Sequence, residues 1–237
     1  MSLSLDYYFS HRDAFPFPAW FDGMCRASEI LEKATAFLEE RLVVPGIEEN
    51  HAILKGVPPH LYGNYYIGPG TVLYNNVTIM GPVYIGKNVE ILPGATIRPG
   101  TIISDNCSVG HGSEIKHSVL FGGAKVASLA FVGDSVLGKS ARIGSGVITA
   151  NRKFDQSNAT LKLEEDIHDL GADFFGTIIG DRSRLGANSV TQPGTHIGPD
   201  TWIFPLTNVR GFIPREKRVF TEGALCMTEN EVIDLKP

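Results

Sequence analysis

Two basic residues, Arg98 and Lys116, have the type and spacing that most clearly suggest a binding site. If one coil of a repeating fold separates them, they lie about 4.8 Å apart, which is the spacing of neighbouring strands. Two cations at that distance repel each other unless an anion lies between them, and a phosphate can accept two hydrogen bonds from one guanidinium. The pair therefore predicts a phosphate site. The alternative is that both are solvated surface cations, paired with Glu114 or Asp134.

A six-residue periodicity defines the elements that would position this pair. Every sixth residue from Ile67 to Phe121 is large and apolar, and the pattern resumes at Ile143 and, with one threonine, from Ile179 to Ile203. An α-helix cannot keep a strict six-residue period, and a long strand would alternate without Gly or Pro between its residues. Short strands joined by tight turns satisfy both facts, and the 26 glycines and 14 prolines can supply the turns.

Three such strands make one triangular coil of about eighteen residues, and stacked coils share one hydrophobic core. We therefore predict an all-β fold, a parallel β-helix, for most of the chain. The expected organisation is an N-terminal helical cap at 1–64, the β-helix at 65–214 with an insertion at 151–177, and a C-terminal extension at 215–237.

The segments outside the repeat have simpler interpretations. Apolar residues at helical spacing between Trp20 and Leu42 predict the helical cap. We expect it to cover the first coil, because the end of a coil exposes core residues and strand edges. Beyond the β-helix, Leu225 to Leu235 is expected to return along the coil as a strand.

Composition argues against several classes of protein. A net charge of −5 and a pI of about 5.8 give no electrostatic support for a nucleic-acid partner. The three cysteines, Cys25, Cys107 and Cys226, are far apart and odd in number, so we expect no disulfide framework and a cytoplasmic location. No apolar run is long enough to span a membrane and no signal-peptide pattern is evident, so we expect neither a membrane partner nor a leader.

Five segments follow one another without gaps in a way that resembles one known family. They are 97–100 (IRPG), 109–116 (VGHGSEIK), 131–138 (FVGDSVLG), 143–146 (IGSG) and 149–151 (TAN). Together they resemble the acetyltransferase domain of bifunctional sugar-1-phosphate nucleotidylyltransferase/acetyltransferases, such as the bacterial N-acetylglucosamine-1-phosphate uridylyltransferase. Archaeal-type members, which carry a similar insertion after the Asn, look nearer still. The resemblance covers residues 65–214, and the nucleotidylyltransferase domain is not expected.

The resemblance implies a left-handed β-helix, which is an exception to the usual right-handed crossover. It also implies a homotrimer with sites between subunits, an acceptor that is a sugar phosphate or nucleotide sugar, acetyl-CoA as donor, and no metal. By position, it assigns Arg98 and Lys116 to the acceptor phosphate, Asn151 to the acceptor, Ser145 to the acetyl donor, and Ala187 and Phe204 to the CoA arm.

Several positions depart from the family pattern. Ser128 stands where the family has its catalytic His, Phe131 replaces a Tyr that touches the acceptor, and Arg142 stands where the nearest members carry Asn. Serine cannot act as a general base at neutral pH, so amine acetylation would need another proton acceptor. Phe204 and Leu206 replace small residues and are expected to narrow the channel for CoA.

Three histidines are candidates for the missing base. By register, His111 is the nearest, because it lies one coil below Leu129 and next to Ser128. His117 falls on a different strand, and His168 lies on the insertion, from which it could reach a neighbouring subunit's site. For each of them the alternative is an exposed histidine with a structural role.

The insertion at 151–177 is expected to carry function, because long insertions in a regular repeat usually do. We expect Arg152, Lys153 and His168 to lie near a neighbouring subunit, with Phe174 and Phe175 buried there.

Three functions are consistent with these features. The first is an acyltransferase acting on a sugar phosphate or nucleotide sugar, with an unusual or relocated base. The second is a non-catalytic relative that binds such a compound. The third is a purely structural trimer. The resemblance favours the first, although likeness of a whole domain indicates a class of reaction rather than one reaction.

Overall fold

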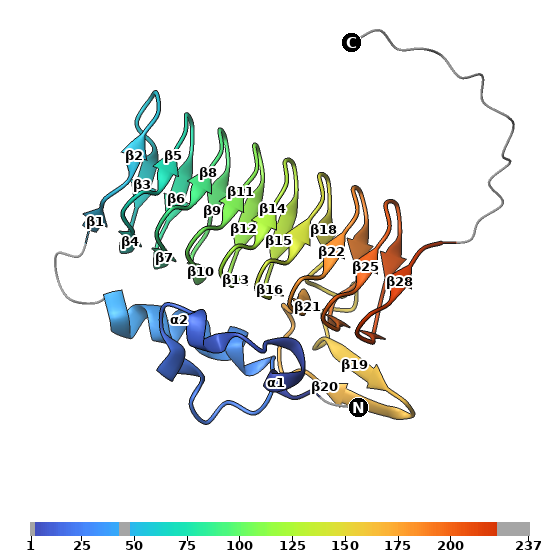
Figure 1. Cartoon of the computed structure of the whole chain (residues 1–237). Coiled ribbons are helices and arrows are strands. Elements are labelled where there is room, and N and C mark those ends of the chain that lie inside the picture. The colour runs from blue at the N-terminus through green and yellow to red at the C-terminus, as the bar shows by residue number, and fades with distance from the viewer. Residues whose placement is uncertain (1–2, 43–47, 222–237) are drawn as a thin grey trace, which may run out of the picture.

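The computed structural model describes residues 3–42 and 48–221. Three parallel sheets form a stack of coils along one axis, and the N-terminal helices lie beside the stack (Figure 1). The helical elements are α1 (Leu5–Tyr8), the 3₁₀ turns η1 (Arg12–Ala14) and η2 (Pro18–Phe21), and α2 (Glu29–Leu42).

Each coil contributes one short strand to each of three sheets. The first sheet contains β1 (Glu48–Asn50), β4 (Tyr65–Ile67), β7 (Val83–Ile85), β10 (Thr101–Ile103), β13 (Val119–Leu120), β16 (Val136–Leu137), β21 (Thr177–Ile179), β24 (Thr195–Ile197) and β27 (Phe212–Ile213). The second sheet contains β2 (Ile53–Leu54), β5 (Val72–Leu73), β8 (Glu90–Ile91), β11 (Ser108–Val109), β14 (Lys125–Val126), β17 (Arg142–Ile143), β22 (Arg184–Leu185), β25 (Trp202–Ile203) and β28 (Arg218–Val219). The third sheet contains β3 (His60–Tyr62), β6 (Thr78–Met80), β9 (Thr96–Ile97), β12 (Glu114–Lys116), β15 (Phe131–Gly133), β18 (Ile148–Thr149), β23 (Val190–Thr191) and β26 (Asn208–Val209).

This arrangement is the left-handed parallel β-helix that was predicted. Its coils begin earlier and end later than the expected range of 65–214, because β1 and β2 already pair with β4 and β5, and β28 still pairs with β25. The six-residue pattern did not reveal the first coil, because this coil places few large residues inside. Ala52 and Leu61 are only partly buried against the core. The strand expected at Leu225 to Leu235 lies outside the described residues.

The six-residue rule fails at one corner in two successive coils, at His117 and again at Asp134, and this corrects the predicted core. Ile103 pairs with Leu120, so this coil has 17 residues (120 − 103), whereas the previous one has 18 (103 − 85, from Ile85). The chain turns at His117 with a φ of 45° and reaches the next strand one residue sooner. Leu120 therefore points into the coil, and Phe121 lies outside it, stacked on Phe9 at a ring distance of 4.8 Å.

The outer face of the first sheet is apolar, and the N-terminal segment covers it. Ile102, Val119, Val136 and Ile178 point away from the coil interior, yet all four are fully buried. Helix α2 packs on β10 and β13 through its buried apolar stripe (Figure 1). The expected helix is therefore present, but it covers one side of the stack and not the end of the first coil, because the outward residues of the first sheet are apolar.

The insertion forms an antiparallel hairpin of β19 (Thr160–Leu163) and β20 (Asp166–Asp169). Its base is closed by backbone hydrogen bonds, including one of 2.8 Å from the Phe175 N–H to the Asn151 carbonyl. Leu161 and Phe175 are buried within the same chain. None of the described helices is long and apolar enough to cross a bilayer.

Candidate functional site

The predicted phosphate residues lie on the outer face of the third sheet, but each already has an anionic partner. The Arg98 guanidinium donates to Glu114 at 2.8 Å, and Lys116 Nζ donates to Asp134 at 2.9 Å. The chain's own carboxylates therefore neutralise the stacked cations, as the alternative interpretation predicted. Arg98 remains 41% exposed, so one side of its guanidinium still faces solvent, whereas Lys116 is only 21% exposed.

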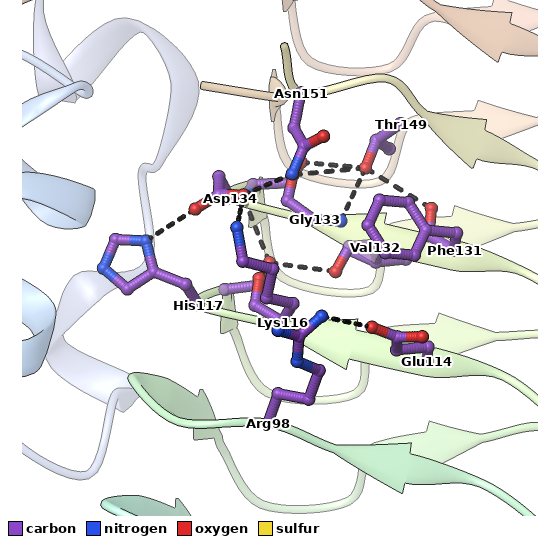
Figure 2. A network of polar contacts seen from close by, with 12 residues as sticks. Arg98, Glu114, Lys116, His117, Phe131, Val132, Gly133, Asp134, Thr149 and Asn151 are labelled. Carbon is purple, nitrogen blue, oxygen red and sulfur yellow. Dashed lines mark hydrogen bonds and ion pairs between the residues drawn. The ribbon is translucent and has the colours of Figure 1, made fainter. Parts of the chain in front are cut away.

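Asp134 is the centre of a buried polar network, the Asp134 network, that also contains Lys116, His117 and Asn151 (Figure 2). Its side chain is only 4% exposed, and it accepts hydrogen bonds from Lys116 Nζ at 2.9 Å, His117 Nδ1 at 3.0 Å and Asn151 Nδ2 at 2.5 Å. Burial by itself would raise the pKa of Asp134. The three donors outweigh burial and hold the pKa below its usual value, so the carboxylate stays ionised.

The absence of a side chain at Gly133 lets two predicted acceptor residues approach each other. A Cβ atom at Gly133 would lie 2.6 Å from Phe131 Cε1 and 2.7 Å from Asn151 Nδ2. The Phe131 ring therefore lies over the backbone of its own strand, beside the Asp134 network (Figure 2). The structure thus brings together the predicted residues Lys116, Phe131 and Asn151.

The flanks of the insertion contact this network within the same chain. Lys116 Nζ lies 4.2 Å from the centre of the Phe174 ring, and the Arg152 guanidinium lies 4.7 Å from the same ring. Phe175 stacks on His196. The expectation that both phenylalanines pack against a neighbouring subunit is therefore wrong for Phe175, because the first sheet already offers it an apolar surface.

Two of the residues predicted to bind the acyl donor, Ser145 and Ala187, lie at the corner between the second and third sheets. We call Pro93, His111, Ser128, Ser145 and Ala187 the corner column, because backbone hydrogen bonds connect consecutive coils along it. The carbonyls of these residues accept from the next coil at 2.8–3.1 Å. Beside the column lies a shallow hollow of about 190 Å³, whose lining includes Ser128, Ser145 and Arg142.

His111 is held in one tautomer by its neighbour in the column. Its Nδ1 lies 2.7 Å from the carbonyl oxygen of Pro93. A carbonyl can only accept, so Nδ1 carries the proton and Nε2 presents a lone pair in the neutral ring. The Leu129 N–H donates to the His111 carbonyl at 2.8 Å, which places His111 one coil below Ser128, as predicted from the register.

The other two histidines lie elsewhere. His117 is at the opposite corner of the third sheet, bound to Asp134, and His168 is half-buried on β20 opposite Leu161. Sequence reasoning missed His117 as a hydrogen-bond donor because its corner loses one residue of the repeat. It also missed His196, which is fully buried between Phe175 and Tyr8.

The remaining predicted residues lie on the second sheet or at its edge. Arg142 is exposed on β17, and Phe204 directly follows β25, where it contacts Phe220 at a ring distance of 6.0 Å. The residues predicted to bind the acyl acceptor and those predicted to bind the acyl donor therefore lie on two neighbouring faces of the prism and at the corner between them. Within the described residues no cluster of side chains could hold a metal ion.

Comparison with known proteins shows which proteins this chain is similar to. Residues 79–168 match the family model described as the GMPPB C-terminal domain. A relative named Uncharacterized acetyltransferase YaiX, from Escherichia coli, is 38% identical over 152 residues, which cover 64% of this chain and 66% of the relative. A relative named Bifunctional protein GlmU, from Methanococcus aeolicus, is 36% identical over 193 residues, covering 73% of this chain and 44% of that protein.

A UDP-N-acetylglucosamine acyltransferase from Francisella novicida is among the similar solved structures, with 16% identity, a TM-score of 0.40, and coverage of 69% of this chain and 66% of that one. The chain therefore spans about two thirds of one relative and less than half of the other. The repeat and these relatives define a hexapeptide-repeat protein that is similar to acetyltransferases. In sequence, this chain is similar to the acetyltransferase YaiX and to the bifunctional protein GlmU, in agreement with the resemblance that its motifs indicated.

Proposed function

We propose that this protein transfers an acyl group from acyl-CoA to a sugar phosphate or nucleotide sugar at the corner column. The observation that carries the proposal is the position of His111, a histidine of fixed tautomer, in the same column as Ser128 and Ser145. Acyl transfer to an amine or hydroxyl requires a proton acceptor, which this histidine can supply. The name of the relative YaiX, an uncharacterized acetyltransferase, supports this class of reaction.

In this proposal His111 is the general base, in place of the histidine that the family carries at the position of Ser128. Nε2 of His111 accepts the proton of the attacking amine or hydroxyl, a bond forms between that atom and the acyl carbon, and the bond from the acyl carbon to sulfur breaks. The CoA sulfur leaves and takes up a proton. Ser128, in the position of the family's histidine, can accept or donate hydrogen bonds but cannot perform the proton transfer at neutral pH.

We further propose that the acceptor phosphate binds beside Arg98. Its guanidinium is held by Glu114 on one side and is open on the other. Lys116 is enclosed by Asp134 and Phe174, so its role is to fix the Asp134 network rather than to contact the phosphate directly. Asn151 orients the acceptor through its amide oxygen, because Asp134 already occupies the amide nitrogen.

A homotrimer is part of the proposal. Covering the first sheet with the chain's own N-terminal segment leaves two different faces, the second and third sheets, for contact with other copies. A cyclic trimer needs two different surfaces on each subunit. One subunit's third sheet, with Arg98 and Phe131, would then face another's second sheet, with Arg142. A cytoplasmic location remains our proposal, supported by the free thiols of Cys25 and Cys107.

Turnover of acetyl-CoA tests the proposal. We expect CoA release with glucosamine 1-phosphate or an amino nucleotide sugar, and little effect of Ser128→Ala. Ser128→His would place a base at the family position and is expected to raise turnover, most strongly together with Phe131→Tyr, because the two side chains would share one pocket. Binding of the sugar phosphates without any CoA release, in the wild type and in Ser128→His, would instead identify a non-catalytic binding protein.

A further inference from the structure

A groove of about 930 Å³ lies between the insertion hairpin and the last coils of the β-helix. Its walls come from β19 and β20 of the hairpin, from the ends of β23 and β26 on the third sheet, and from β27 on the first sheet. The hairpin is packed closely against the coil, because a Cβ atom at Gly194 would lie 2.8 Å from the Thr160 carbonyl oxygen. The fold therefore holds the groove in shape, and none of its residues belongs to the corner column.

Basic side chains outnumber acidic ones in the groove. Among the described residues, Lys153, Lys162 and Arg210 line it, together with Glu164. The two lysines lie 3.9 Å and 3.7 Å from carboxylates of the insertion that are largely exposed, so these ion pairs are weak. Within residues 3–42 and 48–221, Arg210 has neither an ion pair nor a side-chain hydrogen bond. Its place in a groove that two lysines share distinguishes Arg210 from other unpaired cations of the fold, and the three together suit an anion with several charges.

The groove also contains groups that suit a nucleobase. Gln192 Nε2 donates to Asn208 Oδ1 at 3.0 Å, which leaves the Gln192 amide oxygen and the Asn208 amide nitrogen for other partners. An acceptor beside a donor matches the edge of adenine, which Asn and Gln side chains bind in nucleic acids. Ile167, 71% exposed on β20, and Phe212 line the same groove and can cover a flat ring. An adenine nucleotide, with its base and phosphates, therefore fits these features together.

The corner column continues into a side chain that obstructs the direct path for an acyl donor. Leu206 follows Ala187 there, since its N–H donates to the Ala187 carbonyl at 3.0 Å, and its side chain is 76% exposed. Phe204, which is 40% exposed, lies beside the same corner. A donor arm that starts at Ser145 is therefore turned away from the corner and across the third sheet.

The groove lies within reach of such an arm. From Ser145 to the level of Arg210 the stack rises two strands, about 10 Å, and the third sheet is crossed over about four residues, about 13 Å, so the straight distance is about 16 Å. The pantetheine arm of CoA has the reach of about four extended residues, about 14 Å, and the diphosphate adds to it. Arg98, the proposed partner of the acceptor phosphate, lies five strands from Arg210, about 24 Å, so the nucleotide of an acceptor would lie nearer to Arg98 than to the groove.

The proposed trimer leaves the groove accessible. Because Phe212 belongs to the first sheet, the groove opens at the edge between the third and first sheets. The first sheet is covered by the chain's own N-terminal segment and faces no other copy in that arrangement. A donor that lies between the third sheet of one subunit and the second sheet of another can therefore place its nucleotide end at this edge.

We propose that the groove binds the nucleotide end of the acyl donor, an adenosine with a 3′-phosphate and a 5′-diphosphate, while the thioester lies at Ser145. Arg210 and the two lysines hold the phosphates, and Gln192 with Asn208 holds the edge of the adenine. The inference rests on the proposed function for the identity of the donor. It concerns binding, however, so its test requires no turnover.

Isothermal titration calorimetry of the whole protein tests the proposal with CoA, with dephospho-CoA, which lacks the 3′-phosphate, and with 4′-phosphopantetheine, which lacks the nucleotide. Wild type is expected to bind CoA at least about tenfold more tightly than phosphopantetheine, with dephospho-CoA in between. Lys162→Gln with Arg210→Gln should weaken CoA binding about fivefold to thirtyfold and phosphopantetheine binding less than about twofold.

Arg26→Gln with Lys87→Gln is the matched control. Arg26, like Lys162, lies 3.7 Å from a glutamate three residues away, and Lys87, like Arg210, has no acid partner among the described residues. The control should change neither Kd by more than about twofold.

Three results would overturn the proposal. Equal affinity of wild type for CoA and phosphopantetheine would show that the nucleotide is not bound, and equal weakening in the two double variants would indicate attraction without a site. Displacement of CoA by equimolar UDP, lost in Lys162→Gln with Arg210→Gln, would assign the groove to the acceptor's nucleotide. Groove-dependent CoA binding by a protein that releases no CoA from acetyl-CoA would support this inference and count against the proposed acyl transfer.

Discussion

Removing the Asp134 carboxylate is the perturbation whose cost the structure defines best. Asp134→Ala leaves Lys116, His117 and Asn151 without their shared acceptor in a place where Asp134 itself was only 4% exposed. Breaking a fully buried ion pair costs about 3–5 kcal/mol. Lys116 and His117 are 21% and 28% exposed and can partly rehydrate, so we expect a loss of about 3 kcal/mol.

Chemical denaturation measures this loss directly, and the midpoint of thermal unfolding should fall by about 6–12 °C. Asp200→Ala is the matched control. It also removes a bidentate partner, that of Arg182, but at the surface, and should cost less than about 1 kcal/mol. A loss for Asp134→Ala no larger than that for Asp200→Ala would refute the view that the network stabilises the third sheet.

The pH dependence of the unfolding free energy is a second test with the same Asp134→Ala variant. Because the pKa of Asp134 is lower in the folded protein, its stabilising effect is complete above the unfolded-state value of about 3.9. The effect is lost as the pH falls through the folded-state pKa. The difference in unfolding free energy between wild type and Asp134→Ala should therefore be constant from pH 5 to 8 and shrink below about pH 4.

Three further variants test the packing around the site. Gly133→Ala should displace Phe131 or Asn151 and raise the KM for the acceptor while the fold survives, as circular dichroism would show. Phe121→Ala should cost about 3–5 kcal/mol in denaturant unfolding, because the ring fills the cluster under the N-terminal segment. Burial lowers the pKa of His196 to about 4, so wild type should lose stability as the pH falls from 6.5 to 4, and this loss, about 2–3 kcal/mol, should disappear in His196→Phe.

The fold was predictable because a single position in each six-residue repeat shows the period. A large apolar residue at every sixth position has few other physical explanations. The first of the two one-residue deletions, at His117, was hidden because Leu120 and Phe121 are both large and apolar, so either could fill the coil. Helical spacing in 29–42 showed that one face of α2 is apolar, but not which surface of the β-helix it would cover.

The candidate site was predictable in part for a similar reason. Register alone placed His111 beside Ser128 and offered both Glu114 and Asp134 as partners for the stacked cations, which is what the structure shows. The tautomer of His111 could not be predicted from the sequence, because it depends on the contact of Nδ1 with the Pro93 carbonyl.

The rate of acyl transfer by His111→Gln tests the central claim most directly. Glutamine keeps the size and the hydrogen bond to the Pro93 carbonyl but cannot accept a proton. If His111 is the base, kcat with acetyl-CoA and the preferred acceptor should fall about 10²–10⁴-fold, while Kd for both substrates stays within about twofold. A variant that turns over at the wild-type rate would contradict the account and remove the corner column's histidine from the mechanism.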